Sequence, residues 1–343
     1  MARKKSLIVS ATAVAAVMAG TLSTGLLSGP ERVSAGQVAA TARVASQASQ
    51  GVQERYPHGL RGKAVHKGTP RPAKARRLSA EAGVRLTLDV VDRHGKPASE
   101  TSVVLYPLNG DMPFYADLVD GHAEGEVPAG KYAVLTHVGT VEGNGETSWA
   151  LVYRPEVAIN EATGLLLDAR SAVPITSAVV DRADAGLLNG GVRVVQEIAG
   201  QPVVTSDMLS LKNAYITPTG DTPGLALDLQ AVFTREAAEM GSPYVYNVAT
   251  RISGGVPQKP QLNVRTGDMA AAKTAYGTEG RPACVGGHAL PLWPDGGIST
   301  GYFTGVGSVP GTRTEYYSPG IAWDIDWMNT EPGCNFEYGT TEI

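Results

Sequence analysis

The sequence has little of what metal and cofactor sites are usually built from. Its 343 residues include two cysteines and six histidines, and the histidines are scattered over positions 58, 66, 94, 122, 137 and 288. A zinc site needs clustered Cys, His or carboxylate ligands. Cys284 and His288 lie four positions apart with Gly286 and Gly287 between them, and no second pair lies beside them, so we expect His288 in a loop. The sequence therefore predicts no resident metal and no cofactor.

A serine-based catalytic site is missing as well. Residues 297–301 match the pattern Gly-x-Ser-x-Gly, but no His follows Ser299 in the chain and no helical pattern follows it. The nucleophile elbow needs a strand-to-helix turn and a later acid and His. We interpret the match as a Gly-rich turn, name no catalytic residue, and predict that the chain is not an enzyme.

Calcium is a better candidate than zinc, because the predicted body of the protein is acidic and extracellular. Asp89 and Asp92 flank one predicted turn, and Asp324 and Asp326 would project from one side of an extended segment. No calcium loop of fixed register contains them. We expect solvated carboxylates, with a bound calcium as the alternative.

The long apolar run of the chain is confined to its start. Arg3, Lys4 and Lys5 precede an uncharged stretch over 7–27, and Val33-Ser34-Ala35 forms a small-x-small cleavage site. These are the three zones of a secretory signal peptide. We predict a signal peptide over 1–35, cleavage before Gly36, and a secreted, extracellular protein with no stable membrane insertion. A retained membrane anchor is the alternative.

Charge changes sign at about residue 83. The residues before it hold 13 Lys+Arg against 3 Asp+Glu, and the residues after it hold 16 against 30. Residues 36–82 are basic, rich in Gln and Ser and interrupted by proline, which is typical of a disordered linker or propeptide. An anionic cell wall would suit this linker, whereas the acidic body argues against nucleic acid as a partner.

The body predicts strands and turns. Residues 84–91 alternate apolar and polar side chains, and 92–97 have turn composition. Further short strands are expected at 101–105, 151–153 and 164–167, with a turn followed by a strand over 127–134. Residues 83–172 therefore predict a small antiparallel β-sandwich. Residues 173–343 predict a larger β-rich, sandwich-like domain, with strands at 192–198, 225–233, 244–252 and 302–306 and short helices at 234–240 and 268–276. The fold class is all-β.

Two features of the second domain stand out. An extracellular compartment permits disulfides, so Cys284 and Cys334 are predicted to form a bridge unless they lie far apart. Nine of the 21 aromatic residues lie between 293 and 338. Aromatics either fill a β-sandwich core or form a binding face, and we name Tyr316, Tyr317, Trp323 and Trp327 as the candidate binding surface.

Several passages resemble the non-catalytic C-terminal regions of secreted bacterial subtilisin-like serine peptidases. Residues 86–97 with 127–132 are similar to a carboxypeptidase-regulatory-like, or transthyretin-like, module, and 165–170 are similar to the strand that leaves it. Residues 244–246, 255–257, 268–276 and 312–317 with Trp323 resemble the sheet that follows. The family's Gly-Thr-Ser-Met-Ala-x-Pro nucleophile segment is absent from this chain.

The resemblance implies a secreted, non-catalytic accessory or binding module. Its partner would be cell-wall polysaccharide or a peptidase chain. Two alternatives stay open: a cell-wall or carbohydrate-binding surface protein, and a remnant or truncated subtilisin-like peptidase.

Overall fold

The protein is built of β-strands throughout the residues that the computed structural model describes, which are 75–78, 83–98, 101–208, 210–277, 283–296 and 302–330. This confirms the predicted all-β class. The predicted signal peptide, most of the predicted linker, Ser299 and Cys334 lie outside the described residues. None of the helices in the described part reaches the length and hydrophobicity that a membrane-spanning helix needs.

The first predicted strand and turn are present as expected. Strand β2 (Val84–Val91) turns Leu86, Leu88 and Val90 into the core, and the residues between them lie nearer the solvent. In the turn that follows, the Asp92 carboxylate accepts hydrogen bonds from the backbone N–H groups of residues 94 and 96. This is the local bonding by which Asp favours turns.

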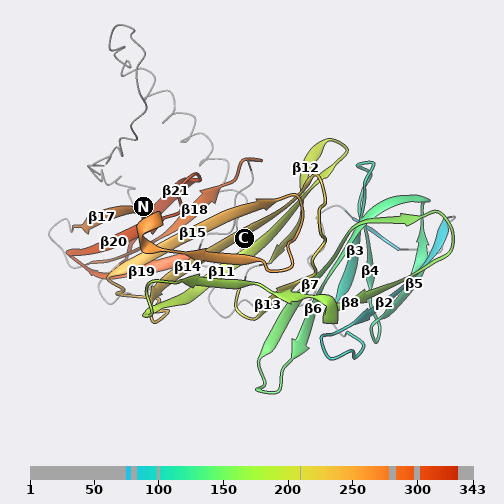
Figure 1. Cartoon of the computed structure of the whole chain (residues 1–343), viewed down its shortest axis with the longest axis horizontal. Helices are drawn as coiled ribbons and strands as arrows, with labels where there is room; N and C mark the ends of the chain where they lie inside the picture. The colour runs from blue at the N-terminus through green and yellow to red at the C-terminus, as the bar shows by residue number, and fades with distance from the viewer. Residues whose placement is uncertain are drawn as a thin grey trace, which may run out of the picture. The chain divides into compact units, whose positions relative to one another are not determined.

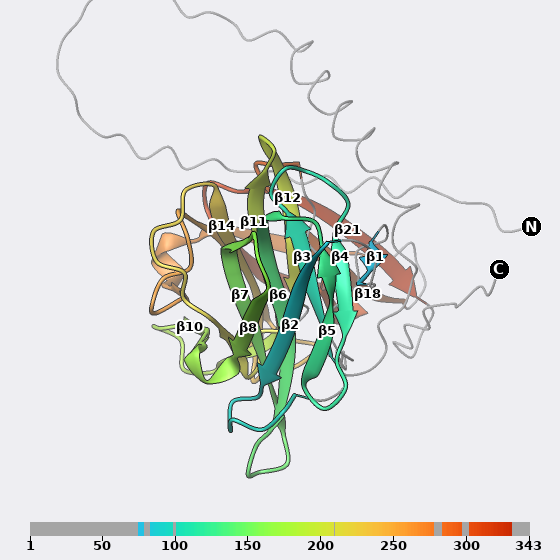
Figure 2. The same ribbon diagram turned by 90° about the vertical axis from the view of Figure 1, so that its right-hand side faces the viewer.

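Two sheets form the first sandwich (Figure 2). Sheet B has the order β5 (His122–Val127), β2, β8 (Thr163–Asp168). Sheet A has the order β1 (Arg76–Arg77), β4 (Phe114–Asp117), β3 (Ser102–Pro107), β6 (Gly130–Val141), β7 (Thr147–Ile159), β13 (Ala214–Ile216), β9 (Val173–Pro174). The pairs β1–β4, β2–β8 and β7–β13 are parallel, so the sandwich is mixed and not purely antiparallel.

Sheet A is covered on both faces. Val103, Val134 and Val152 pack with sheet B in one core, whereas their neighbours Val104 and Leu135 belong to a second core. That second core joins sheet A to sheet D. Sheet D has the order β12 (Gln201–Met208), β11 (Ala185–Ile198), β14 (Leu225–Arg235), β15 (Tyr244–Ser253), β20 (Gly311–Tyr317), β17 (Ala270–Tyr276) (Figure 1).

Smaller elements border the second core. A parallel two-stranded sheet, β10 (Thr176–Val179) with β16 (Gln261–Val264), contributes Val179 and Leu262 to it. Two single-turn 3-10 helices lie in the connections, η1 (Ala169–Ser171) and η2 (Thr266–Asp268). Both β9 and β13 belong to sheet A although they follow residue 172 in the chain.

Sheet E packs on the far face of sheet D. Its order is β19 (Phe303–Val309), β18 (Ala283–Leu292), β21 (Ala322–Thr330). Gly286 and Gly287 of β18 lie under aromatic rings, because a Cβ on them would come within 2.1 Å of Phe303 and within 2.4 Å of Trp327. His288 is therefore a strand residue, and its prediction as a loop residue is wrong.

The two predicted helices are also wrong. Residues 234 and 235 end β14, and Glu236 and Ala237 have φ values of +53° and +56°, which places a turn where the first helix was expected. The second segment forms β17, which pairs along its whole length with β20 at the edge of sheet D. The alanines of this segment favour helix locally, and the long-range pairing overrides that preference.

A closed ring of ion pairs joins sheets D and E. Arg193, Asp228 and Arg251 are cross-strand neighbours on β11, β14 and β15. Asp228 lies 2.7 Å from the Arg193 guanidinium and 2.6 Å from that of Arg251. Asp295, in the turn after β18, closes the ring at 2.9 Å from Arg193 and 3.1 Å from Arg251. We call these four residues the ion ring.

A third carboxyl lies beside the ion ring. Asp207 of β12 is paired with Arg193 across the strands and is half-buried. Burial raises the pKa of Asp207 to about 6, the positive charge of Arg193 opposes the shift, and the negative charge of Asp228 adds to it.

We expect Asp228→Ala to destabilise the protein by about 3–5 kcal/mol, because it removes one of the two carboxylates that Arg193 and Arg251 share and leaves the positive charge of the ion ring only half balanced. Urea unfolding measures this change. Glu156→Gln is the control, since Glu156 pairs with Lys131 on the surface and exposed pairs contribute about 1 kcal/mol or less. A loss for Asp228→Ala that is no larger than the loss for the control would contradict the role given to the ring.

Candidate binding site

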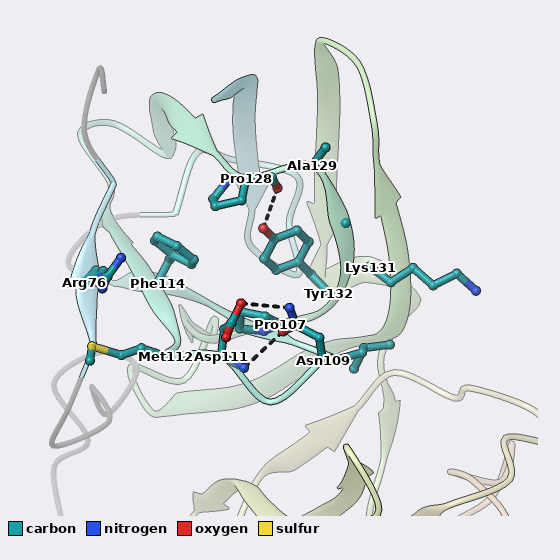
Figure 3. Close-up of a pocket in the computed structure, with 12 residues that line it drawn as sticks. Arg76, Pro107, Asn109, Asp111, Met112, Phe114, Pro128, Ala129, Lys131 and Tyr132 are labelled. Atoms are coloured by element: carbon teal, nitrogen blue, oxygen red, sulfur yellow. Dashed lines mark hydrogen bonds between the residues drawn. The ribbon is translucent and has the colours of Figure 1, made fainter. Parts of the chain in front are cut away.

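A pocket of about 550 Å³ lies at one end of the first sandwich (Figure 3). It is formed by β1, the turn between β3 and β4, the start of β4 and the turn between β5 and β6. Its walls combine apolar, aromatic and charged side chains from segments far apart in the sequence: Arg76, Pro107, Leu108, Asn109, Asp111, Met112, Phe114, Pro128, Ala129, Gly130, Lys131 and Tyr132.

The turn between β3 and β4 holds a carboxylate at the rim. The Asn109 side chain accepts a hydrogen bond from the Asp111 backbone N–H at 3.0 Å and donates one to the Asp111 carboxylate at 2.8 Å. Gly110 between them has a φ of +88°, a conformation that glycine adopts at little cost. Asp111 is exposed, so its carboxylate is accessible to a ligand from the solvent.

Two aromatic rings form the inner wall. Phe114 and Tyr132 meet edge to face with centroids 6.4 Å apart. The Tyr132 hydroxyl donates to the carbonyl oxygen of Pro128 at 2.5 Å, and only 2 % of the residue is exposed. Burial raises the pKa of Tyr132, and the charge of Asp111 adds to the shift, so the hydroxyl stays protonated and engaged with the backbone.

The cations of the pocket lie on opposite sides of it. Arg76 is exposed on β1 beside Phe114, whereas Lys131 points away from the two rings (Figure 3) and pairs with Glu156 at 2.7 Å. Arg76 and Asp111 therefore offer opposite charges around an apolar centre that also includes Met112, which is 42 % exposed. These groups suit recognition of a ligand, and the pocket walls hold no pair of nucleophile and base.

The candidate aromatic surface is divided between two faces of sheet D. Tyr316 stacks on Tyr246 with centroids 4.3 Å apart and packs against the second core. Tyr317 lies on the other face and meets Trp323 edge to face at 5.7 Å, and Trp327 meets Tyr276 at 5.2 Å. All four residues are half-buried with partners in this chain, so we locate the candidate site elsewhere, and ligand binding by these rings stays a prediction.

A polar centre lies among these rings. Arg313 and Glu315 are buried and pair at 3.0 Å. The Glu315 carboxylate also accepts hydrogen bonds from the hydroxyls of Tyr276 and Tyr317. Burial raises the pKa of both tyrosines, which keeps their hydroxyls available as donors. Because Glu315 already accepts from three side chains, it serves as a structural anion.

Sequence reasoning missed the ion ring, this polar centre and the pocket. The signal for the ring was present: Arg193 lies between two valines, and Asp228 lies between two leucines. A charge inside an apolar run of a strand indicates a buried ion pair, because an unpaired buried charge is too costly. The pocket has no such signal, since its two turns meet only in the folded chain.

The remaining predicted sites give a mixed result. Cys284 is buried in β18, but Cys334 lies outside the described residues, so the bridge stays a prediction. The Asp89 carboxylate accepts a hydrogen bond from Nδ1 of the exposed His122 at 2.8 Å. No group of three or more potential metal ligands occurs among the described residues.

We expect Tyr316→Ala to lower the free energy of unfolding by about 3 kcal/mol, because it removes a ring that is stacked against the second core. Thermal and urea unfolding measure the loss. Ile325→Ala on β21 is the control, since Ile325 is 41 % exposed and its truncation opens no cavity. If Tyr316→Ala left the stability unchanged, the packing role of Tyr316 would be contradicted, and this ring would again be a candidate for the binding surface.

Comparison with known proteins finds no match: no family model fits the chain, and neither a curated protein nor a solved structure is similar to it. The resemblance to the accessory regions of subtilisin-like peptidases therefore stays a proposal.

Proposed function

We propose that the chain is a secreted, non-catalytic module that binds an extended polypeptide segment in the pocket beside Phe114. The observation that carries this proposal is that the pocket wall presents exposed side chains of opposite charge, Arg76 and Asp111, around an apolar centre. A polypeptide carries charges of both signs and apolar side chains at short spacing. Tyr132 is almost fully buried, so among the described residues of the pocket wall the half-buried Phe114 is the one aromatic ring that a sugar ring could stack on.

The resemblance to peptidase accessory regions supports the same class of ligand. The proposed partner is a peptidase chain or another exported polypeptide, and the signal-peptide pattern of residues 1–35 supports an encounter outside the cell. Binding to cell-wall polysaccharide is the alternative that the basic linker favours. The further alternative, a remnant of a subtilisin-like peptidase, has its support in the same resemblance.

The binding proposal is tested with fluorescein-labelled, carboxymethylated casein as an unfolded polypeptide probe. We expect saturable binding in fluorescence anisotropy, weakened at least fivefold by the double substitution Asp111→Ala with Met112→Ser. Both side chains are exposed, so the melting temperature should stay unchanged. Val141→Ser is the matched control, because Val141 is 69 % exposed and does not line the pocket.

Two outcomes would overturn the proposal. One is the absence of casein binding, and the other is binding that the double substitution leaves unchanged. Co-sedimentation with purified peptidoglycan in the absence of casein binding would favour the cell-wall alternative.

The proposed exported state includes a disulfide between Cys284 and Cys334. Closing a loop of about 50 residues should stabilise the fold by about 4 kcal/mol on the chain-entropy model. A peptide map without reductant should show one cross-linked species, and Cys334→Ser should lower the melting temperature. Two alkylatable thiols in the exported chain would refute the bridge.

A further inference from the structure

The edge of sheet A at β4 is already occupied by a short segment of this chain. Strand β1 adds to β4 in parallel, with Arg76 opposite Phe114 and Arg77 opposite Tyr115. The Arg76 N–H donates to the carbonyl oxygen of Pro113 at 2.8 Å, and the Leu78 N–H donates to that of Tyr115 at 2.9 Å. Main-chain pairing of this kind is how sheet edges bind extended peptides.

Leu78 anchors the segment between two sheets. It packs against the first core together with Phe114 and Leu118, which belong to the sheet A side of the sandwich. On the sheet B side it lies over Gly125 of β5, where an added Cβ would come within 2.8 Å of the Leu78 Cβ. Gly125 thus leaves a seat for one apolar side chain between the edge strands β4 and β5.

Charge on β4 complements the segment. The Arg77 guanidinium lies 3.7 Å from the Asp117 carboxylate at the end of β4. Arg76 contributes to the wall of the pocket. Each residue of the segment therefore has its own contact. Arg76 lies at the pocket, Arg77 lies at Asp117, and Leu78 fills the seat.

We propose that this edge is a strand-addition site for an extended polypeptide with two consecutive basic residues followed by Leu, and that β1 is its intramolecular occupant. The proposal deepens the proposed function, on which it rests, because it names the partner's sequence pattern and the segment that competes with it. Strand β1 is two residues long, and it is held by main-chain pairing with β4, by the seated Leu78 side chain and by the exposed contact between Arg77 and Asp117. The covalent connection of β1 to the same chain also favours its binding to the edge, because it gives β1 an effective concentration in roughly the millimolar range.

The test uses a labelled, end-capped peptide with the sequence of residues 74–80, Lys-Ala-Arg-Arg-Leu-Ser-Ala. The full chain carrying Leu78→Ser frees the edge. We expect this variant to bind the peptide at least tenfold more tightly than the unmodified chain does. A peptide with Ser in place of its Leu should lose that binding, because it cannot fill the seat.

Gly125 provides the steric test. Adding Gly125→Ala to the Leu78→Ser chain should weaken peptide binding at least tenfold, since the new Cβ occupies the seat. Gly164→Ala on β8 of the same sheet is the matched control, because no atom lies within 4 Å of its Cβ position. Absence of peptide binding to the Leu78→Ser chain, or binding that Gly125→Ala leaves unchanged, would overturn the proposal.

A second measurement does not depend on how well the Leu78→Ser chain folds. In the otherwise unmodified chain, Gly125→Ala should displace β1 and speed tryptic cleavage after Arg76 and Arg77 at least fivefold, whereas Gly164→Ala should not. Equal cleavage rates would count against the seat. A dimer of the unmodified chain that Gly125→Ala abolishes would show that a second copy supplies the strand, and would overturn the intramolecular assignment.

The casein experiment separates this proposal from the one on which it rests. If casein binding depends on Asp111 and Met112 but not on Gly125, strand addition fails and the pocket survives as a binding site. If casein does not bind at all, the proposed function fails, and the peptide experiment then shows only whether the edge recognises its own segment.

Discussion

Sheets A and D are each covered on both faces, so a polar side chain on either sheet that points into a core must find its partner there. On the D–E side most of this pairing is supplied by the ion ring and by the cluster at Glu315, although Nη1 of Arg313 has no hydrogen-bond partner among the described residues. Removing ions from water costs several kcal/mol each, and close geometry is needed to offset that cost. The ring achieves this because its two carboxylates and two guanidinium groups alternate. The same ring fixes where sheet E packs, since Asp295 is supplied from the turn after β18.

This double coverage leaves the edges and ends of the sheets for recognition. The broad faces of A and D are occupied by other parts of the chain, and the flat aromatic surface expected from the sequence is largely used in packing. The pocket lies where two turns meet at an end of the first sandwich, and the β1 segment lies at the adjoining edge. Both use exposed charges, the half-buried Phe114 at the border of the first core, and the edge of β4, which β1 occupies.

Local signals predicted the first part of the fold and less of the second. Strand β2 and its turn follow from alternation and from the bonding capacity of Asp92, which are properties of a few neighbouring residues. Strand β17 does not follow from local signals, because its alanine-rich segment becomes a strand only through its pairing with β20. Strand β18 was missed because its two glycines resemble a loop until Phe303 and Trp327 cover them.

The candidate site was the least predictable feature. Asp111 and Tyr132 are separated by the two strands β4 and β5 and the turns that follow them, and neither residue lies in a motif that indicates the other as its neighbour. The Arg-Arg-Leu segment was assigned to the linker on composition, and its composition is that of a linker. Pairing with the edge of β4 and the space above Gly125 give those three residues a place in the sandwich.

Asp207 makes the stability of the junction between β11 and β12 increase as the pH falls, which is the reverse of the usual effect of a carboxyl group. Carboxyl groups whose pKa is lowered by folding, such as Asp168 and Asp181, contribute stability that is lost as the pH falls. Asp207 has its pKa raised to about 6, above the ordinary value near 4, so the folded chain takes up its proton more readily than the unfolded chain. Its contribution is full below about pH 4 and is lost as the pH rises through 6. Moderate acidification therefore neutralises the surplus carboxylate beside the ion ring and stabilises this corner of sheet D.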